Sequence, residues 1–184
     1  MPVSERTYER LALEDAEGQW ELHKGRLREK PGMGAEHTDL TFYLAHLLQP
    51  QLDRGTFKLK TNGTRVRRAS APGSVFIPDV VIVPVEMEVR FRGRPGTLEI
   101  YDQPLPLVVE IWSQSTDDYD INEKLPEYQL RGDEEIWRIH PFERAVTAWR
   151  RQPDGSYEPS FYQGGIIELR SLPGVTIDLD VLFE

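Results

Sequence analysis

The chain of 184 residues contains no cysteine, and this absence excludes several kinds of chemistry at once. Without thiols there is no disulfide framework, no thiolate zinc site and no cysteine nucleophile. Long apolar runs are also missing, because the longest have the length of a β-strand and not that of a membrane span. Residues 1–6 lack the basic and apolar regions of a secretory signal. We therefore expect a cytoplasmic protein without a membrane partner.

What the chain does contain is the composition of an ordinary globular protein, with 39% hydrophobic and 29% charged residues. Its length allows a sizeable core, and no repeat, low-complexity tract or linker divides it. We therefore expect a single domain over residues 1–184. Helical and strand patterns are interspersed along the chain, which predicts an α/β fold bordering on α+β, with a mixed sheet flanked by helices.

An excess of positive charge is missing, because 31 acidic residues outnumber 22 basic ones and the net charge is −9, which by itself argues against a nucleic-acid binder. The distribution is uneven, however. Between residues 54 and 85 Asp79 is the only acid. The basic residues of the same segment are Arg54, Lys58, Lys60, Arg65, Arg67 and Arg68. This asymmetry fits either a basic groove on an acidic body or a solvated hairpin.

Hydrophobic periodicity predicts the main elements. Helices are expected over residues 4–14, 36–49 and about 117–130. Strands are expected over residues 57–60, 65–67, 76–83, 107–112, 135–140 and 145–149, with a hairpin turning near Gly25 and a meander of short strands up to Ile177. Asn62 and Gly63 are typical of a tight turn between the first two of these strands. Residues 86–103 are polar and are expected to form a long loop.

Two strand-like runs rich in β-branched residues each carry one acid, Asp79 within 77–83 and Glu110 within 105–112. Such runs are typical of strands buried on both faces. A carboxylate buried there is costly unless it is paired, protonated or bound to a metal. Two such acids on neighbouring strands suggest a site for Mg²⁺, or for Mn²⁺ in its place. The backbone carbonyl of Ile111 would be a third oxygen ligand.

A lysine follows these acids on the helix expected over 117–130. The inward face of this helix is defined by Ile121, Leu125 and Tyr128. Lys124 lies at the edge of that face, where an ammonium would orient an attacking water or stabilise developing charge. Other interpretations stay open: Lys124 pairs only with Asp120 at i,i+4, Asp79 is a turn residue, or Glu110 is the buried partner of an arginine.

The order of these motifs resembles the PD-(D/E)XK nuclease superfamily and, within it, the Uma-type restriction endonucleases. The matching residues are 20–25, His37, 78–80, 108–113, Ser115, Thr116, Asp120, Lys124, Tyr128, 135–137, 172–174 and 179–183. The resemblance covers most of the chain. It implies a restriction-endonuclease-like core, Mg²⁺-dependent hydrolysis of DNA phosphodiester bonds and a homodimer that cuts both strands.

The resemblance also implies roles for individual residues. Asp79 is the acid of the Pro-Asp element and Glu110 is the acid of the second element. The usual lysine two residues after Glu110 is replaced by Trp112, and its role passes to Lys124. Glu21 matches an N-terminal acid that joins the metal site or orients a water. A recurrent histidine corresponds to His37, which we expect to be a surface or helix-capping residue.

Contacts with DNA are expected from the basic strands. Alternation places Lys58 and Lys60 on one strand face, and Arg65 and Arg67 on another. Contacts with phosphate would give affinity and salt dependence without sequence specificity. The chain has no helix-turn-helix or zinc-finger module, so specificity would come from the core, a partner or a dimer, for which the apolar C-terminal meander offers an interface.

Three hypotheses follow from the sequence. The first is a metal-dependent endonuclease that acts on DNA. The second is a non-catalytic nucleic-acid-binding module that retains the nuclease fold, which the negative net charge and Trp112 favour. The third is a structural or protein-interaction domain whose two acids form internal salt bridges.

Overall fold

The structure is a computed structural model that describes residues 1–15 and 17–184. Its larger sheet has the spatial strand order β11-β10-β9-β8-β6-β3. These strands are β3 (Phe57–Thr61), β6 (Val80–Pro84), β8 (Leu107–Ile111), β9 (Glu135–His140), β10 (Ala145–Arg151) and β11 (Tyr157–Tyr162). Only β8 and β9 run parallel, so the sheet is mixed. The predicted α/β class with a mixed sheet is confirmed.

A smaller sheet has the order β2-β1-β5-β4-β7, and β12 pairs with β13. The strands are β1 (Trp20–His23), β2 (Arg26–Glu29), β4 (Arg65–Arg67), β5 (Val75–Phe76), β7 (Ile100–Tyr101), β12 (Ile166–Glu168) and β13 (Thr176–Asp178). The helices are α1 (Glu5–Glu14), α2 (Ala35–Leu48), η1 (Gln49–Gln51), α3 (Val85–Glu88), η2 (Val89–Phe91), α4 (Asp117–Tyr119), η3 (Asp120–Lys124), α5 (Leu125–Arg131) and α6 (Leu179–Leu182). Among the described residues, no helix has the length and apolarity needed to span a bilayer.

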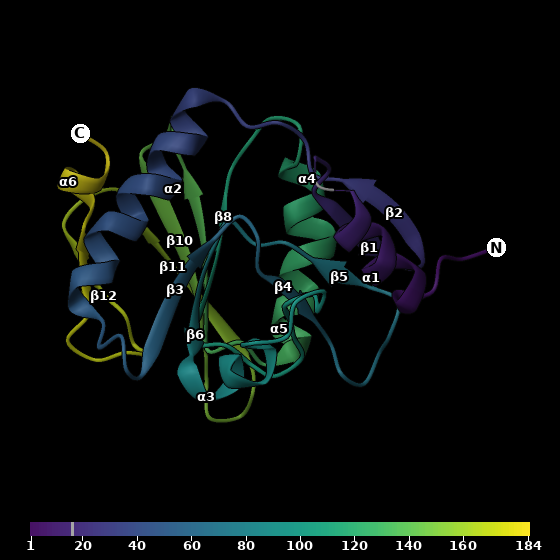
Figure 1. Ribbon diagram of the computed structural model, residues 1–184. Coiled ribbons are helices and arrows are strands. Elements are labelled where there is room, and N and C mark those ends of the chain that lie inside the picture. Colours follow the sequence, from purple (N-terminus) through teal and green to yellow (C-terminus); the bar gives the residue numbers. More distant parts are fainter. Residues whose placement is uncertain (16) are drawn as a thin grey trace.

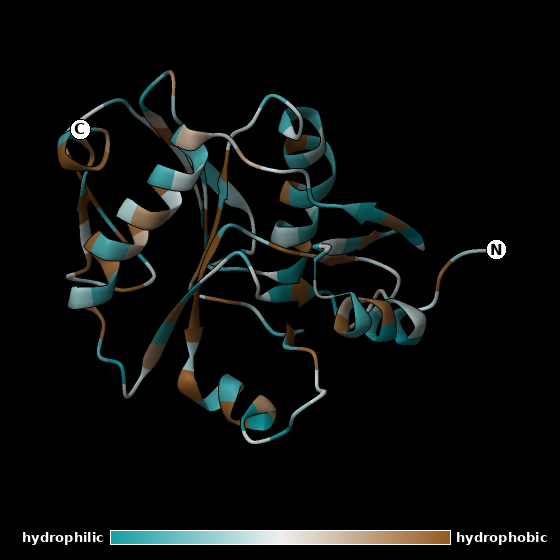
Figure 2. Cartoon of the chain, turned by 45° about the horizontal axis from the view of Figure 1, so that its top comes forward, coloured by the Kyte–Doolittle hydropathy of each residue, from teal (hydrophilic) through white to brown (hydrophobic). Residues whose placement is uncertain are grey.

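Helices cover both faces of the larger sheet (Figure 1). On one face, Leu40 and Leu44 of α2 pack with Val80 and Val109. On the other face, Tyr128 of α5 lies in a cluster that joins residues of β6, β8 and β9 to residues of the smaller sheet. Figure 2 shows the central strands as largely hydrophobic, whereas the helices carry much of the polar surface. The continuous apolar runs of β6 and β8 are therefore explained by burial on both faces.

The expected hairpin of residues 57–60 and 65–67 is wrong, because the two strands belong to different sheets. β3 pairs with β6 of the larger sheet, whereas β4 pairs with β5 and β7 of the smaller one. Asn62 does turn the chain, with φ at 51°, but its N–H donates to the carbonyl of Asp79 at 3.0 Å. Pairing with strands distant in sequence therefore decided the topology.

The expectation of a single strand over 76–83 is also wrong. The segment forms two strands, β5 in the smaller sheet and β6 in the larger one. Pro78 separates them and has no N–H to donate to a strand ladder. The N–H of Ile77 donates instead to Oε1 of Glu21 at 2.8 Å. Asp79 consequently lies where the chain passes from the smaller to the larger sheet.

The helix expected over 117–130 is helical throughout but irregular. α4 leads into η3, a π-helical turn, and then into α5. Pro126 stands in the first turn of α5, where its missing N–H and its ring oppose a regular α-helical turn before it. The wider turn lets Asp120 and Lys124 both point inward, with exposed fractions of 5% and 2%.

The long loop expected over 86–103 is wrong, because these residues contain most of α3, all of η2, and β7. Local ion pairs hold the helical part together. Glu88 accepts from Lys60 of β3 and, at 2.7 Å, from Arg92. The pair with Lys60 depends on β3, which is distant in sequence, so the composition of the segment alone did not reveal it.

A buried arginine joins α5 to the smaller sheet and offers a test of the fold. Arg131 donates to the carbonyls of Arg67, Tyr101 and Gln103 and to the carboxylate of Asp133. We expect Arg131→Met to lower the free energy of unfolding by about 3–5 kcal/mol, because it leaves the buried Asp133 without its partner. Urea denaturation followed by circular dichroism measures this loss.

A matched control is Arg170→Met, at an exposed arginine whose recorded hydrogen bond, to Oε1 of Gln152, is 3.4 Å long. This control is expected to change stability by less than about 0.5 kcal/mol. Equal stability of the two variants would show that Arg131 does not hold α5 against the smaller sheet.

Candidate active site

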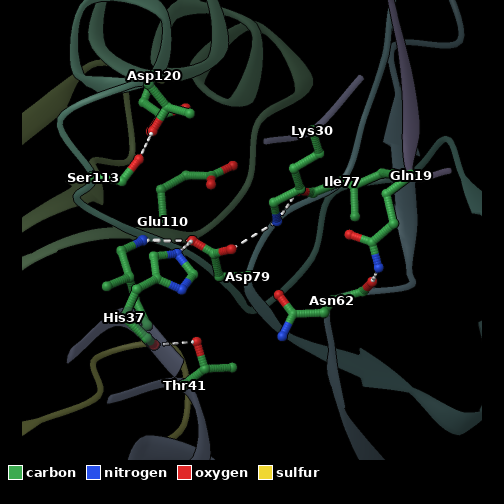
Figure 3. Close-up of polar contacts among 12 residues, drawn as sticks. Gln19, Lys30, His37, Thr41, Asn62, Ile77, Asp79, Glu110, Ser113 and Asp120 are labelled. Carbon is green, nitrogen blue, oxygen red and sulfur yellow. Dashed lines mark hydrogen bonds and ion pairs between the residues drawn. The ribbon is translucent and has the colours of Figure 1, made fainter. Parts of the chain in front are cut away.

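The two acids singled out in the sequence meet at the ends of adjacent strands. β6 and β8 pair antiparallel with Val80 opposite Val109, so one further step places Asp79 opposite Glu110. Both carboxylates are buried, with exposed fractions of 1% for Asp79 and 6% for Glu110. Figure 3 shows the two side chains next to each other. The expectation that the two acid-bearing strands lie side by side is therefore confirmed.

Asp79 is held by three donors from three parts of the chain. Oδ1 accepts from Nζ of Lys30 at 2.7 Å, and Oδ2 accepts from the N–H of Ile111 at 2.7 Å. Nε2 of His37 lies 3.0 Å from Oδ2 (Figure 3). An ionised carboxylate can only accept, so His37 donates here. This carboxylate is therefore fixed in orientation by β8, α2 and the residue that follows β2.

Glu110 belongs to a second cluster, which is centred on Lys124. Nζ of Lys124 lies 2.9 Å from Oε1 of Glu21, 3.2 Å from Oε1 of Glu110 and 3.6 Å from Oδ1 of Asp120. Tyr128 also donates to Oε1 of Glu110. The ammonium thus lies among three buried carboxylates contributed by β1, β8 and η3. The i,i+4 pair with Asp120 exists, but it is only one of three such contacts.

The charges explain the protonation states of these groups. For Asp79, burial opposes ionisation, but the ammonium of Lys30 and the hydrogen bond from His37 outweigh it and hold the pKa below its usual range. Burial raises the pKa of Glu110 well above its ordinary value. Burial alone would lower the pKa of Lys124, but Glu110 and Glu21 raise it well above its ordinary value. Lys124 therefore stays charged.

Two further residues expected from the resemblance are placed at the same site. Glu21 of β1 is buried, and its Oε1 accepts from both Lys124 and the N–H of Ile77. The expectation for His37 is wrong: this residue is neither on the surface nor a helix cap, but is only 4% exposed and contacts Asp79. For Ile111 the structure shows the N–H on Asp79, and the role of its carbonyl in metal binding stays a prediction.

The four basic residues expected to contact DNA are mostly engaged elsewhere. Lys60 pairs with Glu88 and Glu99. Arg65 is buried and donates to the hydroxyl of Tyr8 at 2.9 Å, and Arg67 pairs with Glu5 at 2.7 Å. Lys58 is partly exposed on the edge strand β3. Contact of these residues with phosphate stays a prediction, and for three of them it would require their internal contacts to open.

The donor set matches the chemistry of a hard divalent cation. Asp79 and Glu110 supply carboxylate oxygens, the ligands that Mg²⁺ prefers. Oδ1 of Asp120 is buried and accepts no hydrogen bond, and its one ionic contact, with Nζ of Lys124, is 3.6 Å long, so it is a further oxygen available to a cation. No three histidine or acidic side chains of the described residues converge as a complete metal cage. Because Mg²⁺ commonly takes one or two carboxylates and fills its shell with water and phosphate, two opposed acids are sufficient.

Lys30 is the residue at this site that the sequence did not reveal. It follows β2 directly, and its Nζ also donates to the carbonyl of Ile77 at 3.0 Å. Its side chain is only 5% exposed. A lysine before Pro31 resembles an ordinary solvated residue at the end of a hairpin. Only the packing of the hairpin against Asp79 shows its role, and no local pattern could have predicted it.

Comparison with known proteins agrees with this geometry. Residues 6–181 match the model of the Uma2 family, whose description is "Putative restriction endonuclease". The chain belongs to the Uma2 family. The resemblance inferred from the order of the motifs is thereby confirmed, and it extends over nearly the whole chain. A search of curated proteins found no match.

A solved structure shares the fold of this Uma2 protein. It is the crystal structure of a putative nuclease belonging to DUF820 from Anabaena variabilis ATCC 29413, with a TM-score of 0.70 and 15% sequence identity. The similarity covers 99% of this chain and 98% of the other. At this level of identity the comparison establishes the fold alone.

Proposed function

We propose that this protein is an endonuclease that hydrolyses DNA phosphodiester bonds with Mg²⁺, or with Mn²⁺ in its place. The observation that carries the proposal is the pairing of Asp79 with Glu110 at the ends of adjacent strands, beside the buried ammonium of Lys124. Membership of the Uma2 family supports a nuclease. Within this proposal, Asp79 and Glu110 would hold the metal, and the carbonyl of Ile111 would add a third ligand.

The remaining groups would position the reactants. When bound, the metal would lower the pKa of a coordinated water and neutralise negative charge on the phosphate. Lys124 would orient the attacking water or stabilise charge on the phosphate. Glu21 would hold Lys124 in place, since it lies 2.9 Å from Nζ. His37 and Lys30 would fix the orientation of Asp79, because both contact its carboxylate.

A second candidate is a nucleic-acid-binding module without catalysis. It is favoured by the neutralisation of both acids within the chain, Asp79 by Lys30 and Glu110 by Lys124. If these lysines occupied the place of the metal permanently, the site would bind neither Mg²⁺ nor Mn²⁺. Salt-dependent DNA binding without metal-dependent cleavage would decide for this candidate. The homodimer expected from the sequence stays a prediction for either function.

The proposal is tested by Glu110→Gln. Glutamine retains the shape of the side chain and an oxygen for Lys124 and Tyr128 but removes the charge that a divalent cation needs. We expect plasmid nicking in Mg²⁺ or Mn²⁺ to fall at least about 100-fold. Binding of Mn²⁺, measured by isothermal titration calorimetry, should be lost in parallel.

The control is Glu158→Gln, which changes an exposed acid of β11 and should leave both measurements unaltered. Chelation of the metal with EDTA should stop nicking by the wild-type protein. If the wild-type protein binds neither Mg²⁺ nor Mn²⁺ and nicks no DNA, the proposed endonuclease function is wrong.

A further inference from the structure

Three aromatic side chains form a cluster at the ends of β8 and β9, which we call the aromatic ledge. The rings of Trp112 and His140 stack, with centroids 4.4 Å apart and planes 22° from parallel. Phe142 meets Trp112 edge-on, with centroids 5.8 Å apart at 89°. Such contacts are favourable aromatic geometries and hold the three rings as one unit.

The ledge lies directly beside the candidate active site. β8 and β9 run parallel, with Glu110 in register with Arg138. Trp112 lies two residues after Glu110, and His140 lies two residues after Arg138. The N–H of Trp112 continues the strand ladder by donating to the carbonyl of Ile139 at 2.8 Å. Two residues of extended chain span about 7 Å, and alternation returns the side chain to the same face. The rings therefore continue the face that carries Glu110.

The outermost ring of the ledge is open to solvent, although it is fixed in place. Phe142 is 65% exposed, so much of its ring is accessible to a ligand. Its turn is closed by the N–H of Glu143, which donates to Nδ1 of His140 at 3.1 Å. Pro141 precedes it and restricts the backbone further. A ring held in this way loses little freedom when a flat ligand covers it.

We propose that the aromatic ledge stacks an unpaired nucleobase of the DNA strand whose phosphate enters the site. The identity of this ligand rests on the proposed function. Bases within a duplex are already covered by their neighbours, whereas an unpaired base has a free face for Phe142. The ledge would therefore favour single-stranded or locally opened DNA over an intact duplex, without sequence preference, since every base presents a π-face. Arg144, exposed two residues after Phe142, offers a charge for the adjoining backbone.

The experiment measures binding in EDTA, so that cleavage plays no part. A fluorescein-labelled oligo-dT of 12 nucleotides is titrated with the wild-type protein and with the Phe142→Ala variant. The fluorescence anisotropy of the label gives the Kd of each complex. We expect Phe142→Ala to raise Kd for this strand roughly tenfold. Its effect on an intact duplex of the same length should be less than about twofold. The control is Phe161→Ala, at a phenylalanine of β11 that is 59% exposed, which should bind like the wild type.

A second probe carries abasic residues in place of the thymidines and so has the backbone without the bases. The wild-type protein should bind this probe as weakly as Phe142→Ala binds oligo-dT. The substitution and the abasic probe combined should cost little more than either alone, because both remove the same contact. Because Phe142 is mostly exposed, the variant should keep the wild-type circular dichroism spectrum.

The outcomes separate this inference from the proposed function. If Phe142→Ala and Phe161→Ala have the same Kd, or if the loss is equal on duplex and single strand, the ledge only packs the turn and the inference is wrong. The effects of Phe142→Ala and of the abasic probe are coupled if together they cost little more than either alone. A protein that shows this coupling but cleaves no DNA in Mg²⁺ keeps the inference and overturns the endonuclease function. A protein that cleaves without the coupling overturns the inference alone, and one that binds no DNA overturns both.

Discussion

Replacing Asp79 by alanine is expected to lower the free energy of unfolding by about 3–5 kcal/mol and to abolish cleavage. The cause of the destabilisation is the charge that is left behind. Lys30 has only 5% of its side chain exposed, and Asp79 is its partner at 2.7 Å. Removing one member of a buried ion pair is costly, because the other stays desolvated without compensation. Urea denaturation and plasmid nicking measure the two effects.

The double variant Asp79→Asn with Lys30→Met separates stability from catalysis. Both charges are removed together, and replacing a buried pair by neutral side chains often costs little. We expect most of the lost stability to return, whereas cleavage stays absent because a metal ligand is missing. If Asp79→Ala alone is as stable as the wild type, Lys30 does not depend on Asp79 and the buried pair has been misinterpreted.

The ion pair of Asp79 with Lys30 also predicts how the contribution of Asp79 to stability depends on pH. Although burial alone would raise it, the pKa of Asp79 is held below its usual range by Lys30 and His37. A carboxyl whose pKa is lower in the folded state stabilises the fold above its unfolded pKa, about 3.9, and this contribution is lost as the pH falls through the folded pKa. The difference in unfolding free energy between the wild type and Asp79→Asn should therefore be full at pH 7 and shrink below about pH 4.

The sequence was sufficient to find the two acids because their neighbours are so strongly apolar. Val80, Val81 and Ile82 on one strand, and Val108 and Val109 on the other, have almost no polar interruption. Such runs must be buried on both faces, so a single acid in each is conspicuous. Nothing local competes with this signal, which explains why the two buried runs and the acid in each of them could be expected.

The partners of these acids were harder to predict because they come from other parts of the fold. Lys30 and His37 reach Asp79 across more than forty residues of chain, and the hydrogen-bond pattern around Pro78 splits one apolar run between two sheets. The Asn-Gly signal at Asn62 correctly predicted a change of direction, but it carries no information on which strands pair afterwards. Local patterns determine turns and burial, whereas pairing and polar partners depend on the tertiary structure.

Replacing Lys124 by methionine is expected to reduce cleavage by about 10²–10⁴-fold, the range of a positioned acid–base or charge-stabilising group. Methionine fills a similar volume without the charge. The substitution removes the ammonium from among Glu21, Glu110 and Asp120, all within 3.6 Å of Nζ. The melting temperature should fall as well, because the three carboxylates are left to repel one another.

Lys124→Met should also respond to metal differently from the wild type. Three buried carboxylates without their ammonium attract a divalent cation more strongly, and a ligand that binds only the folded state raises its stability. We therefore expect Mg²⁺ or Mn²⁺ to raise the melting temperature of the variant by more than that of the wild type, while cleavage stays low. The control Lys24→Met changes an exposed lysine near the same helix and should alter neither result. If Lys124→Met cleaves like the wild type, Lys124 takes no part in the reaction and does not take over the role of the lysine that Trp112 replaces.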